Sequence, residues 1–495
     1  MSRIIIQNGN MCELDLPLKF AQKLYNEFAI RHPNAFYLRT RQRGMQNWDG
    51  KIHYITKTGQ FKIGLLPKVY DMCIEMGIKP KVVDMRQPLP KVSKVVTNIG
   101  KYKLRPEQEK AVKAVINNKI GNTPFHIGVL DYTVNAGKTL IMSSLYLSYK
   151  KQLKTLLITN DSDWLNQARE EFKQYLPGED ITFVQGKVLN WSNFTIGMVQ
   201  SISRNMRFYQ KELSQIDMVL IDEADQGGSK QYQNVITRLF NTRIRIGLSG
   251  TIYMSKLAKD RVKNMNLECF FGKVIAEFKL KDSIKKGYST KTVVKMVPGK
   301  PWYGNWESDC ISYKEIYDDS ITENNTAWTM AYSRLRWNIN QGRYPALVVC
   351  KHIAHCENLY KFFKKKLGDA YNIAYVHVNT PSKLRQQIMR DFREGKIDIL
   401  VSTTIIARGK NFPKLRYLLN AASMDSQEKS IQFLGRLVRT DKSKKKVYLD
   451  DLHYTGPYLD RHGNHRKQYY QRQELKVILL DKLWKKHPNH SLIKS

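Results

Sequence analysis

Residues 218–225 read MVLIDEAD, an apolar run that ends in acidic residues. A short, continuous apolar run of this kind is typical of a strand buried on both faces of a parallel sheet. Similar runs alternate with helical stretches along the chain: TLLIT, IRIGLSG, ALVVC, YNIAYVHV, IDILVST and LRYLLNAA. This alternation predicts an α/β fold with two parallel-sheet domains, which we place at residues 96–295 and 296–455.

The acids of MVLIDEAD occupy the carboxyl end of their predicted strand. Asp222 can hold Mg²⁺ there, and Glu223 beside it can orient or deprotonate an attacking water. An edge strand with solvated acids is the alternative for this string alone. The acids lie 84 residues (222 − 138) after a Gly-Lys-Thr string at Lys138, a spacing that fits two strands of one nucleotide-binding sheet.

The Gly-Lys-Thr string belongs to TVNAGKTL, which has the end of a phosphate-binding loop. In such a loop the backbone amides cradle phosphates at a helix N-terminus. Lys138 is expected to reach the β- and γ-phosphates, and Thr139 to hold Mg²⁺. The usual first glycine of the motif is replaced by Tyr132. Together with the acids, the loop predicts an enzyme that hydrolyses nucleoside triphosphates.

The string IQFLGRLVR in the second block follows a Q-x-x-G-R-x-x-R spacing. On a helix, Gln432, Arg436 and Arg439 would share one face. A solvated basic face is the ordinary alternative for such residues. With a nucleotide site in the first block, we expect the arginines to stabilise the charge of the transition state.

The composition indicates a polyanionic partner. Lys and Arg number 82 against 44 Asp and Glu, which gives a net charge of +38. Such an excess points to nucleic acid and is unusual for a metabolic enzyme. Residues 1–100 carry 16 basic and 7 acidic residues, and residues 441–495 carry 13 and 6. No apolar run approaches the length of a membrane span, and the six cysteines form no disulfide framework, so we expect a cytoplasmic protein without a membrane partner.

The remaining segments predict a separate N-terminal domain and a C-terminal tail. Residues 1–95 are interpreted as a basic DNA-recognition domain with a helix over 16–29. The stretch FYLRTRQRGMQNWDGKIHYI predicts two strands around a glycine turn, with Trp48 in the core. Residues 291–324 are interpreted as an inter-domain connection or insertion. Residues 456–495 are interpreted as a basic tail with an amphipathic helix over 473–485. In the N-terminal domain the predicted DNA contacts are Arg39, Arg41 and Arg43.

The ordered motifs over residues 102–440 resemble those of the superfamily 2 helicases. LRPEQEKAV resembles their adenine-recognition segment, MVQSI a nucleic-acid-contacting motif, and LSGT the motif that couples hydrolysis to strand movement. The resemblance implies nucleotide contacts by Arg105, Gln108, Asn135, Ala136, Gly137 and Gly409. It also implies strand contacts by Gln200, Ser201, Thr403 and Thr404, and coupling by Ser249, Gly250 and Thr251.

Several details favour the bacteriophage UvsW-type branch of this superfamily. The DEAD string also occurs in RNA helicases, but the S-G-T string and the leading Gln432 differ from the corresponding motifs of those enzymes. The N-W-D-G-K-I core resembles the N-terminal domain of the UvsW-type helicases. This resemblance implies two tandem RecA-like domains behind a small α+β N-terminal domain. It implies ATP and Mg²⁺ as cofactors and remodelling of forks, Holliday junctions and R-loops.

The same resemblance implies the partners and the setting. These are branched or single-stranded DNA, RNA in RNA–DNA hybrids, and single-strand-binding or recombination proteins. The setting is phage replication, recombination or repair in the host cytoplasm. Two alternatives stay open. One is an RNA helicase or a duplex translocase that does not unwind. The other is a strand-annealing DNA-binding protein whose ATPase has decayed.

Overall fold

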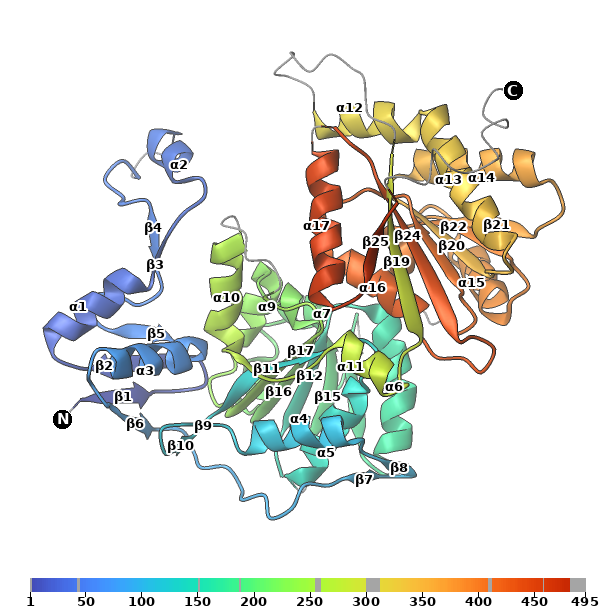
Figure 1. Cartoon of the computed structure of the whole chain (residues 1–495). Helices are drawn as coiled ribbons and strands as arrows, with labels where there is room; N and C mark the ends of the chain where they lie inside the picture. Colours follow the sequence, from blue (N-terminus) through green and yellow to red (C-terminus); the bar gives the residue numbers. More distant parts are fainter. Residues whose placement is uncertain are drawn as a thin grey trace. The chain divides into compact units, whose positions relative to one another are not determined.

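The computed structural model describes residues 2–41, 45–149, 152–186, 188–253, 260–299, 312–407, 412–456 and 458–480 (Figure 1). The chain divides into two compact units, Met1–Phe278 and Lys279–Ser495. The first unit contains a small four-stranded sheet and an eight-stranded sheet, and the second contains a seven-stranded sheet. The two large sheets and the small α+β domain confirm the predicted fold class.

The N-terminal sheet has the strand order β5-β2-β1-β6. Its strands are β1 (Arg3–Ile6), β2 (Met11–Asp15), β5 (Gln60–Lys62) and β6 (Lys81–Asp84). Alternate residues of β1 and β2 are buried, so one face of the sheet packs against helices. These helices are α1 (Leu18–Glu27) and α3 (Leu66–Glu75), which share a core with the strands. The helix predicted over 16–29 is confirmed by α1.

A two-stranded ribbon with a helix at its end leaves this sheet (Figure 1). The ribbon pairs β3 (Ala29–Arg31) with β4 (Lys51–His53), and the helix is α2 (Ala35–Arg41). We call residues 29–53 the arm. The prediction of strands on both sides of the glycine turn is wrong before the turn, because residues 35–41 are helical. Three consecutive apolar residues, Phe36 to Leu38, imitate a strand, whereas the Leu38 amide donates to the Asn34 carbonyl in a helical turn.

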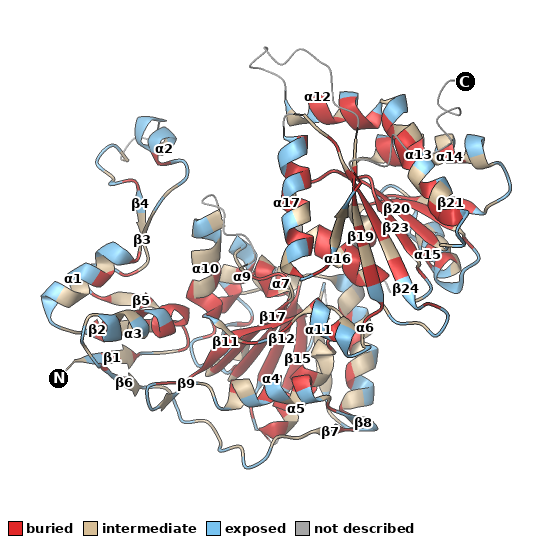
Figure 2. Ribbon diagram, viewed as in Figure 1, coloured by how far each residue is buried: buried red, intermediate tan, exposed pale blue. Residues whose placement is uncertain are grey.

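The eight-stranded sheet of the first unit has the order β14-β13-β15-β12-β16-β17-β11-β18, and all its neighbouring strands are parallel except the β13–β14 pair. Its strands are β11 (His126–Tyr132), β12 (Thr155–Thr159), β13 (Ile181–Gln185), β14 (Val188–Leu189), β15 (Phe194–Met198), β16 (Met218–Asp222), β17 (Ile244–Ser249) and β18 (Val274–Phe278). Every residue of β11, β12, β16 and β17 is buried (Figure 2). Burial on both faces explains their continuous apolar sequences.

The helices of this part are α4 (Pro106–Ile116), α5 (Lys138–Ser148), α6 (Ser162–Tyr175), α7 (Val199–Arg204), α8 (Gln210–Ser214), α9 (Lys230–Ile236) and α10 (Arg261–Phe271). Short pairs β7–β8 (Asn98–Ile99, Tyr102–Lys103) and β9–β10 (Lys119–Ile120, Thr123–Pro124) precede the sheet. Because the strands are parallel, the loops after β11, β12, β15, β16 and β17 all leave the same edge of the sheet.

The N-terminal sheet is docked on the large sheet of its own unit. Arg245 of β17 is fully buried, and its Nη2 donates to the Gly9 carbonyl (2.6 Å) and to Oδ1 of Asn10 (2.8 Å). A Cβ on Gly64 would lie 2.1 Å from the Glu268 carbonyl, so the two backbones approach closely. One cluster of buried apolar side chains continues from the N-terminal sheet into the large sheet. Residues 1–95 are therefore an integral part of the first unit.

The sheet of the second unit has the order β21-β22-β20-β23-β24-β19-β25, with all neighbours parallel. Its strands are β19 (Lys291–Pro298), β20 (Ala346–Cys350), β21 (Ile373–Val376), β22 (Ile399–Thr403), β23 (Tyr417–Asn420), β24 (Lys446–His453) and β25 (Val477–Leu479). Its helices are α11 (Leu280–Lys285), α12 (Tyr313–Tyr317), α13 (Asn325–Ile339), α14 (Ile353–Leu367), α15 (Ser382–Glu394), α16 (Gln427–Leu437) and α17 (Leu459–Arg472).

Three predictions about this unit need correction. The boundary between residues 295 and 296 falls inside β19, and the unit begins at Lys279. The segment 291–324, expected to be a connection, starts with this strand between β24 and β25. The helix expected over 473–485 is absent from its described part, where Val477–Leu479 pairs with β19 as β25. A short apolar run fits a strand as well as a helix, and pairing with an open sheet edge favours the strand.

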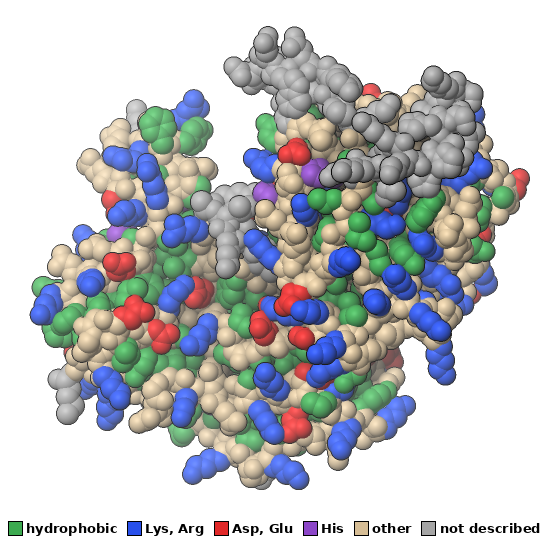
Figure 3. Space-filling view, in the orientation of Figure 1, with side chains coloured by type: hydrophobic (Ala, Val, Ile, Leu, Met, Phe, Trp, Pro, Cys, Tyr) green, Lys and Arg blue, Asp and Glu red, His purple; other side chains and the backbone are tan. Residues whose placement is uncertain are grey.

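No helix within the described ranges is long and apolar enough to cross a membrane. Lys and Arg side chains are spread over the face of the molecule shown in Figure 3, with fewer Asp and Glu between them. This distribution agrees with the net charge of +38.

Candidate active site and nucleic-acid interface

The phosphate loop connects β11 to α5 at the carboxyl edge of the eight-stranded sheet. Asn135 and Gly137 adopt left-handed backbone conformations, with φ of 65° and 71°. A Cβ at Gly137 would lie 2.3 Å from Nε2 of Gln108, so this position requires glycine. Tyr132, in place of the usual first glycine, is buried, and its hydroxyl donates to the Glu107 carbonyl (2.8 Å). The loop thus keeps its turn before the helix although the motif is incomplete.

Lys138, the first residue of α5, lies close to both acids at the end of β16. Its Nζ is 3.3 Å from Oδ1 of Asp222 and 3.8 Å from Oε1 of Glu223. Burial lowers the pKa of this ammonium group, but the attraction of both carboxylates outweighs burial, so its pKa is raised. Thr139 is the next residue of the helix and is half-buried. The structure therefore brings the four residues predicted for phosphate, Mg²⁺ and water to one place.

The two acids have different surroundings. The Asp222 side chain is 4% exposed and the Glu223 side chain 32% exposed, so Glu223 is the more accessible to a water molecule. Glu223 also has a left-handed backbone with φ of 51°, a strained conformation for a residue with a side chain. Strain of this kind is found at functional sites, where the surrounding structure enforces it.

The S-G-T string lies beside both motifs. Ser249 Oγ donates to Oδ1 of Asp225 (2.8 Å) and lies 3.1 Å from the Thr251 hydroxyl. Burial raises the pKa of Asp225, while this hydrogen bond acts in the opposite direction. A Cβ on Gly250 would lie 3.1 Å from the Tyr132 carbonyl, directly before the phosphate loop. The three predicted coupling residues therefore contact the acidic motif and pack against the loop.

Arg105 and Gln108 hold the phosphate loop from the start of α4. Gln108 Nε2 donates to the Ala136 carbonyl (2.8 Å), and Arg105 Nη2 donates to the Asn135 carbonyl (3.0 Å). The Arg105 amide in turn donates to Oε1 of Gln108 (2.9 Å). These residues were predicted to contact the adenine base. The structure adds a second role, because the same side chains fix the carbonyls of the loop.

A chain of polar contacts connects the predicted strand contacts to the acids. Gln200 and Ser201 lie in the first turn of α7, after β15. Gln200 Nε2 donates to the Asn160 backbone carbonyl (3.4 Å), and Nδ2 of the Asn160 side chain donates to Oε1 of Gln226. Gln226 ends the short 3-10 helix η2 (Ala224–Gln226), which follows the acids. Sequence reasoning did not single out Asn160, although the segment 156–172 resembles a nucleic-acid-contacting motif, or Gln226, which directly follows MVLIDEAD.

In the second unit, α16 positions two of the three residues predicted to face the nucleotide. Gln432 and Arg436 are one helical turn apart and half-buried. The helix ends at Leu437, so the prediction that Arg439 continues the same helical face is wrong. The backbone beyond the helix is held instead by Thr290, whose amide donates to the Val438 carbonyl (2.8 Å) and whose hydroxyl donates to the Arg439 carbonyl (3.1 Å).

The predicted strand contacts of this unit follow β22. Thr403 is the last residue of the strand and is buried, and Thr404 starts the 3-10 helix η5 (Thr404–Ala407). Nζ of Lys429, on α16, donates to the Thr404 hydroxyl (3.2 Å). Lys429 therefore ties the arginine-bearing helix to the predicted strand contact. Gly409 lies outside the described residues.

The loop before α16 is held by α17, a contact that sequence reasoning missed. Arg466 of α17 is fully buried, with its Nε 3.0 Å from Oδ1 of Asp451 and its Nη1 donating to the Met424 carbonyl (3.0 Å). His465 Nδ1 lies 2.8 Å from Oδ1 of Asp425. Nothing in a basic helical segment such as 459–472 distinguishes a buried arginine from a solvated one, so no sequence signal marks this residue.

The arm carries the N-terminal residues that were predicted to contact DNA. Arg39 and Arg41 are exposed on α2, while Arg43 lies outside the described residues. Trp48 is half-buried, and its Nε1 donates to the Lys51 carbonyl (2.8 Å). The prediction of Trp48 as a core residue is therefore only partly right, since the indole braces the arm and remains partly exposed.

Two family models match the chain. The model described as the res subunit of type III restriction enzymes matches residues 101–254, and the model of the helicase conserved C-terminal domain matches residues 331–441. The matched segments contain the phosphate loop, the acids and the S-G-T string in the first unit, and α16 in the second. In both segments the chain is similar to the superfamily 2 helicases, including one of the UvsW type.

Three curated proteins are similar to the chain over most of its length. The ATP-dependent DNA helicase uvsW of Enterobacteria phage T4 is 21% identical over 86% of this chain and 85% of its own length. The protein named helicase 22 of Sulfolobus islandicus filamentous virus is 23% identical, with 71% of this chain matched. The same identity is found over 70% of this chain with IRC3 of Saccharomyces cerevisiae. The chain spans 64% of the Sulfolobus viral protein and 51% of IRC3.

Solved structures agree with the fold. The type ISP restriction-modification enzyme LlaBIII bound to DNA has a TM-score of 0.55 at 13% identity, covering 83% of this chain and 34% of LlaBIII. Dbp5 of S. cerevisiae bound to RNA and ADP BeF3 has a TM-score of 0.52 at 13% identity, covering 76% of this helicase and 90% of Dbp5. At this identity the likeness concerns the fold, and it includes one DNA-bound and one RNA-bound protein.

Proposed function

We propose that this helicase hydrolyses ATP to remodel branched DNA, namely forks, four-way junctions and R-loops. The observation that carries the ATPase is the position of Lys138 close to both Asp222 and Glu223, at the carboxyl edge of a parallel sheet. The preference for DNA branches is supported by the similarity to the uvsW DNA helicase over 86% of the chain and by the cationic arm. The proposed place of action is the cytoplasm, which for a phage-encoded chain is that of the host.

The first unit contributes the groups that bind and attack the phosphates. Lys138 binds β- and γ-phosphate oxygens, which replace the carboxylates as its partners. Glu223, the more exposed acid, orients the attacking water and accepts its proton. Arg105 and Gln108 hold the loop carbonyls so that the loop amides face the phosphates.

The oxygen groups of this site fit Mg²⁺. Asp222 supplies a buried carboxylate and Thr139 a hydroxyl, and both are hard oxygen ligands of the kind this ion takes. When bound, Mg²⁺ neutralises charge on the β- and γ-phosphate oxygens. Asp222 and Thr139 are the residues that would hold it.

The second unit supplies positive charge to the transition state. Arg436, with Arg439 after the helix end, stabilises the charge that develops on the transferred phosphoryl group. Gln432 lies one turn before Arg436 on α16 and assists in positioning the nucleotide. Lys429 carries any movement of α16 to Thr404, the predicted contact of the nucleic-acid strand.

Hydrolysis is coupled to the strand by the hydrogen-bond chains of the first unit. One chain runs from Asp225 through Ser249 to Thr251, and the other from Gln226 through Asn160 to Gln200. A change in the segment 222–226 can therefore reach the residues after β15 and β17 through these hydrogen bonds.

The test is ATP hydrolysis by the full chain with single-stranded DNA, single-stranded RNA or neither. We expect DNA to stimulate turnover more than RNA does. Equal or greater stimulation by RNA would favour an RNA helicase. Nucleic-acid binding without any stimulated hydrolysis would support a strand-annealing protein with a decayed ATPase and contradict the proposal.

A further inference from the structure

The arm exposes aromatic side chains on α2, which also carries Arg39 and Arg41. Phe36 of α2 is 80% exposed, and its neighbour Tyr37 is 54% exposed. An exposed aromatic ring can stack on a nucleic-acid base, because every base has a π-face. The Arg41 guanidinium lies 5.0 Å from the centre of the Tyr37 ring and forms a cation–π contact with it. Phe36 is thus the most exposed aromatic side chain in the described part of the arm.

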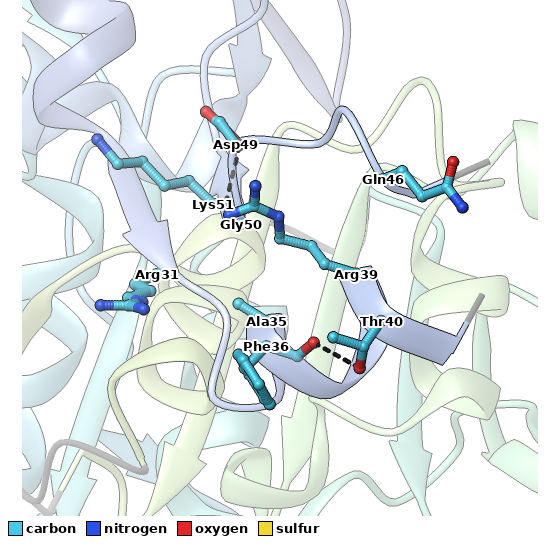
Figure 4. Close-up of a pocket in the computed structure, with 9 residues that line it drawn as sticks. All are labelled: Arg31, Ala35, Phe36, Arg39, Thr40, Gln46, Asp49, Gly50 and Lys51. Atoms are coloured by element: carbon cyan, nitrogen blue, oxygen red, sulfur yellow. Dashed lines mark hydrogen bonds between the residues drawn. The ribbon is translucent and has the colours of Figure 1, made fainter. Parts of the chain in front are cut away.

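Phe36 borders a pocket of about 560 Å³ that is lined by cations (Figure 4). Arg31, Arg39 and Lys51 line it, and in Figure 4 the Arg39 side chain reaches from α2 toward Gly50. None of these three side chains forms an ion pair within the part of the chain that the structure describes. Three cations against one lining acid, Asp49, leave an excess of positive charge that attracts an anionic ligand.

One acid, Asp49, also lines the pocket, so the lining has three cations and one carboxylate. Residues 29–53 contain five Lys and Arg residues and one acid, Asp49. Asp49 Oδ2 lies 2.6 Å from Nε2 of His53, and its Oδ1 accepts the Lys51 amide at 2.9 Å. The hydrogen bond with His53 is the main cause of the lowered pKa of Asp49. The carboxylate therefore stays ionised, and both of its oxygens accept hydrogen bonds from residues of the ribbon.

The pocket is shaped by the backbone of the arm. Gly50 has φ of +78°, and a Cβ there would lie 3.2 Å from Cβ of Ala35 on α2. Its carbonyl accepts the His32 amide (2.8 Å). Trp48 braces the same turn through the Lys51 carbonyl. α2 is thus seated directly on the glycine turn of the N-W-D-G-K-I core, and the pocket does not depend on a ligand to form.

We propose that this arm pocket holds one unpaired nucleotide at a DNA branch. The ring of Phe36 stacks on the base, while Arg31, Arg39 and Lys51 bind the phosphates on either side. A base in continuous duplex has no free face, whereas a base at a branch has one, so stacking selects branched over linear DNA. Cations and an aromatic ring recognise no particular base, which fits a branch of any sequence. The inference rests on the proposed function and names the contact that selects its substrate.

The test uses the full chain and a fork with 2-aminopurine at the unpaired position next to the branch. We expect binding to change the fluorescence of this base, and Phe36→Ala to abolish the change. Affinity for the fork should fall roughly tenfold, because stacking of one base is worth about that much, while affinity for linear duplex is unchanged. Phe36→Trp should restore both signals. Leu18→Ala is the matched control, because Leu18 is 76% exposed in the same domain but lies outside the arm.

The cations are tested by the salt dependence of fork binding. Arg39→Ala combined with Lys51→Ala should make the slope of log affinity against log salt shallower by about 1.4, since each contact to a single strand contributes about 0.7. Lys57→Ala removes an exposed charge from the turn after β4 and should leave the slope unchanged.

Unchanged fluorescence and fork affinity in Phe36→Ala would overturn the inference. An equal loss of affinity for fork and linear duplex would also overturn it, since it would indicate a general DNA contact. Both results are distinguishable from failure of the proposed function, because DNA-stimulated ATP hydrolysis is measured on the same proteins. If hydrolysis is stimulated by DNA while the Phe36 variants behave like wild type, only the arm inference fails.

Discussion

Glu223 is the residue that we propose as the general base for ATP hydrolysis. Its strained backbone places a partly exposed carboxylate beside Lys138, whereas Asp222 is buried. We expect Glu223→Gln to bind ATP with nearly unchanged affinity and to lose turnover by about 10²–10⁴-fold, the usual contribution of a general base. Separate measurements of nucleotide binding and stimulated hydrolysis check this expectation.

Glu170→Gln is the control for that substitution, because it removes an exposed carboxylate from α6 of the same unit. Lys138→Ala should differ from both variants by weakening ATP binding, since it removes the charge that meets the β- and γ-phosphates. Normal DNA-stimulated turnover in Glu223→Gln and Lys138→Ala would exclude this site as the centre of hydrolysis.

Two buried histidines of the second unit predict acid sensitivity. Burial lowers the pKa of His355 to about 3 and that of His462 to about 4. Both are neutral in the folded chain, so below pH of about 6.5 the unfolded chain binds more protons than the folded one. Stability should therefore be greatest above pH 6.5 and fall as the pH is lowered through 6.5 toward 4.

Thermal unfolding of the full chain between pH 7 and 4.5 measures this dependence. His462→Gln should flatten the decline, because it removes one of the groups that take up protons on unfolding. Asp425, 4.0 Å from Nε2 of His462, opposes the shift and stays in place in this variant. The same slope in wild type and variant would show that His462 does not contribute.

At the scale of elements, α16 is held from two sides, by Thr290 at its end and by α17 at its start. Arg436→Ala should leave ATP binding nearly intact and lower turnover by roughly 10³-fold, as loss of an arginine finger does. Arg436→Lys should not restore turnover, because lysine cannot reproduce the planar, two-pronged contact. A loss of ATP affinity with normal turnover of bound nucleotide would assign Arg436 a different role.

The helix α17 should contribute to the stability of the arginine-bearing lobe. Arg466 and Asp451 are both fully buried, so Arg466→Met leaves a carboxylate without its ion-pair partner in the interior. This change should cost about 3–5 kcal/mol of the free energy of unfolding, measured by chemical denaturation. Lys281→Ala breaks the exposed pair with Glu474 and should leave the unfolding transition where it is. Equal effects of the two substitutions would show that the buried pair of Arg466 and Asp451 does not stabilise this unit.

The elements also show what the sequence could predict. Strands such as β16 and β17 are buried on both faces, so their continuous apolar runs identify them without further information. The helix α2 and the strand β25 were misassigned because short apolar runs carry no clear period. For the site, motifs brought Lys138, Asp222 and Glu223 together correctly. Contacts made by side chains without a motif, such as Arg466 and Gln226, depend on tertiary packing.

At the scale of the molecule, the N-terminal domain is fixed to the first unit. Removing residues 1–95 would leave Arg245 without Gly9 and Asn10 and would expose apolar side chains that now share a core with the N-terminal sheet. We therefore expect this truncation to lower the thermal stability of the whole first unit, measured by calorimetry. Unchanged unfolding of the truncated chain would show that the domain is independent. The fixed docking is the reason to test the arm by single substitutions.

The central claim, an ATP-driven motor that selects branched DNA, is tested most directly by strand displacement. Fork, four-way junction, R-loop and linear duplex of matched sequence are compared at one ionic strength, because salt alone changes binding to all of them. The full chain is predicted to process the branched substrates faster than linear duplex, and only with ATP, while Glu223→Gln processes none. Equal rates on branched and linear DNA, or displacement without ATP, would contradict the claim.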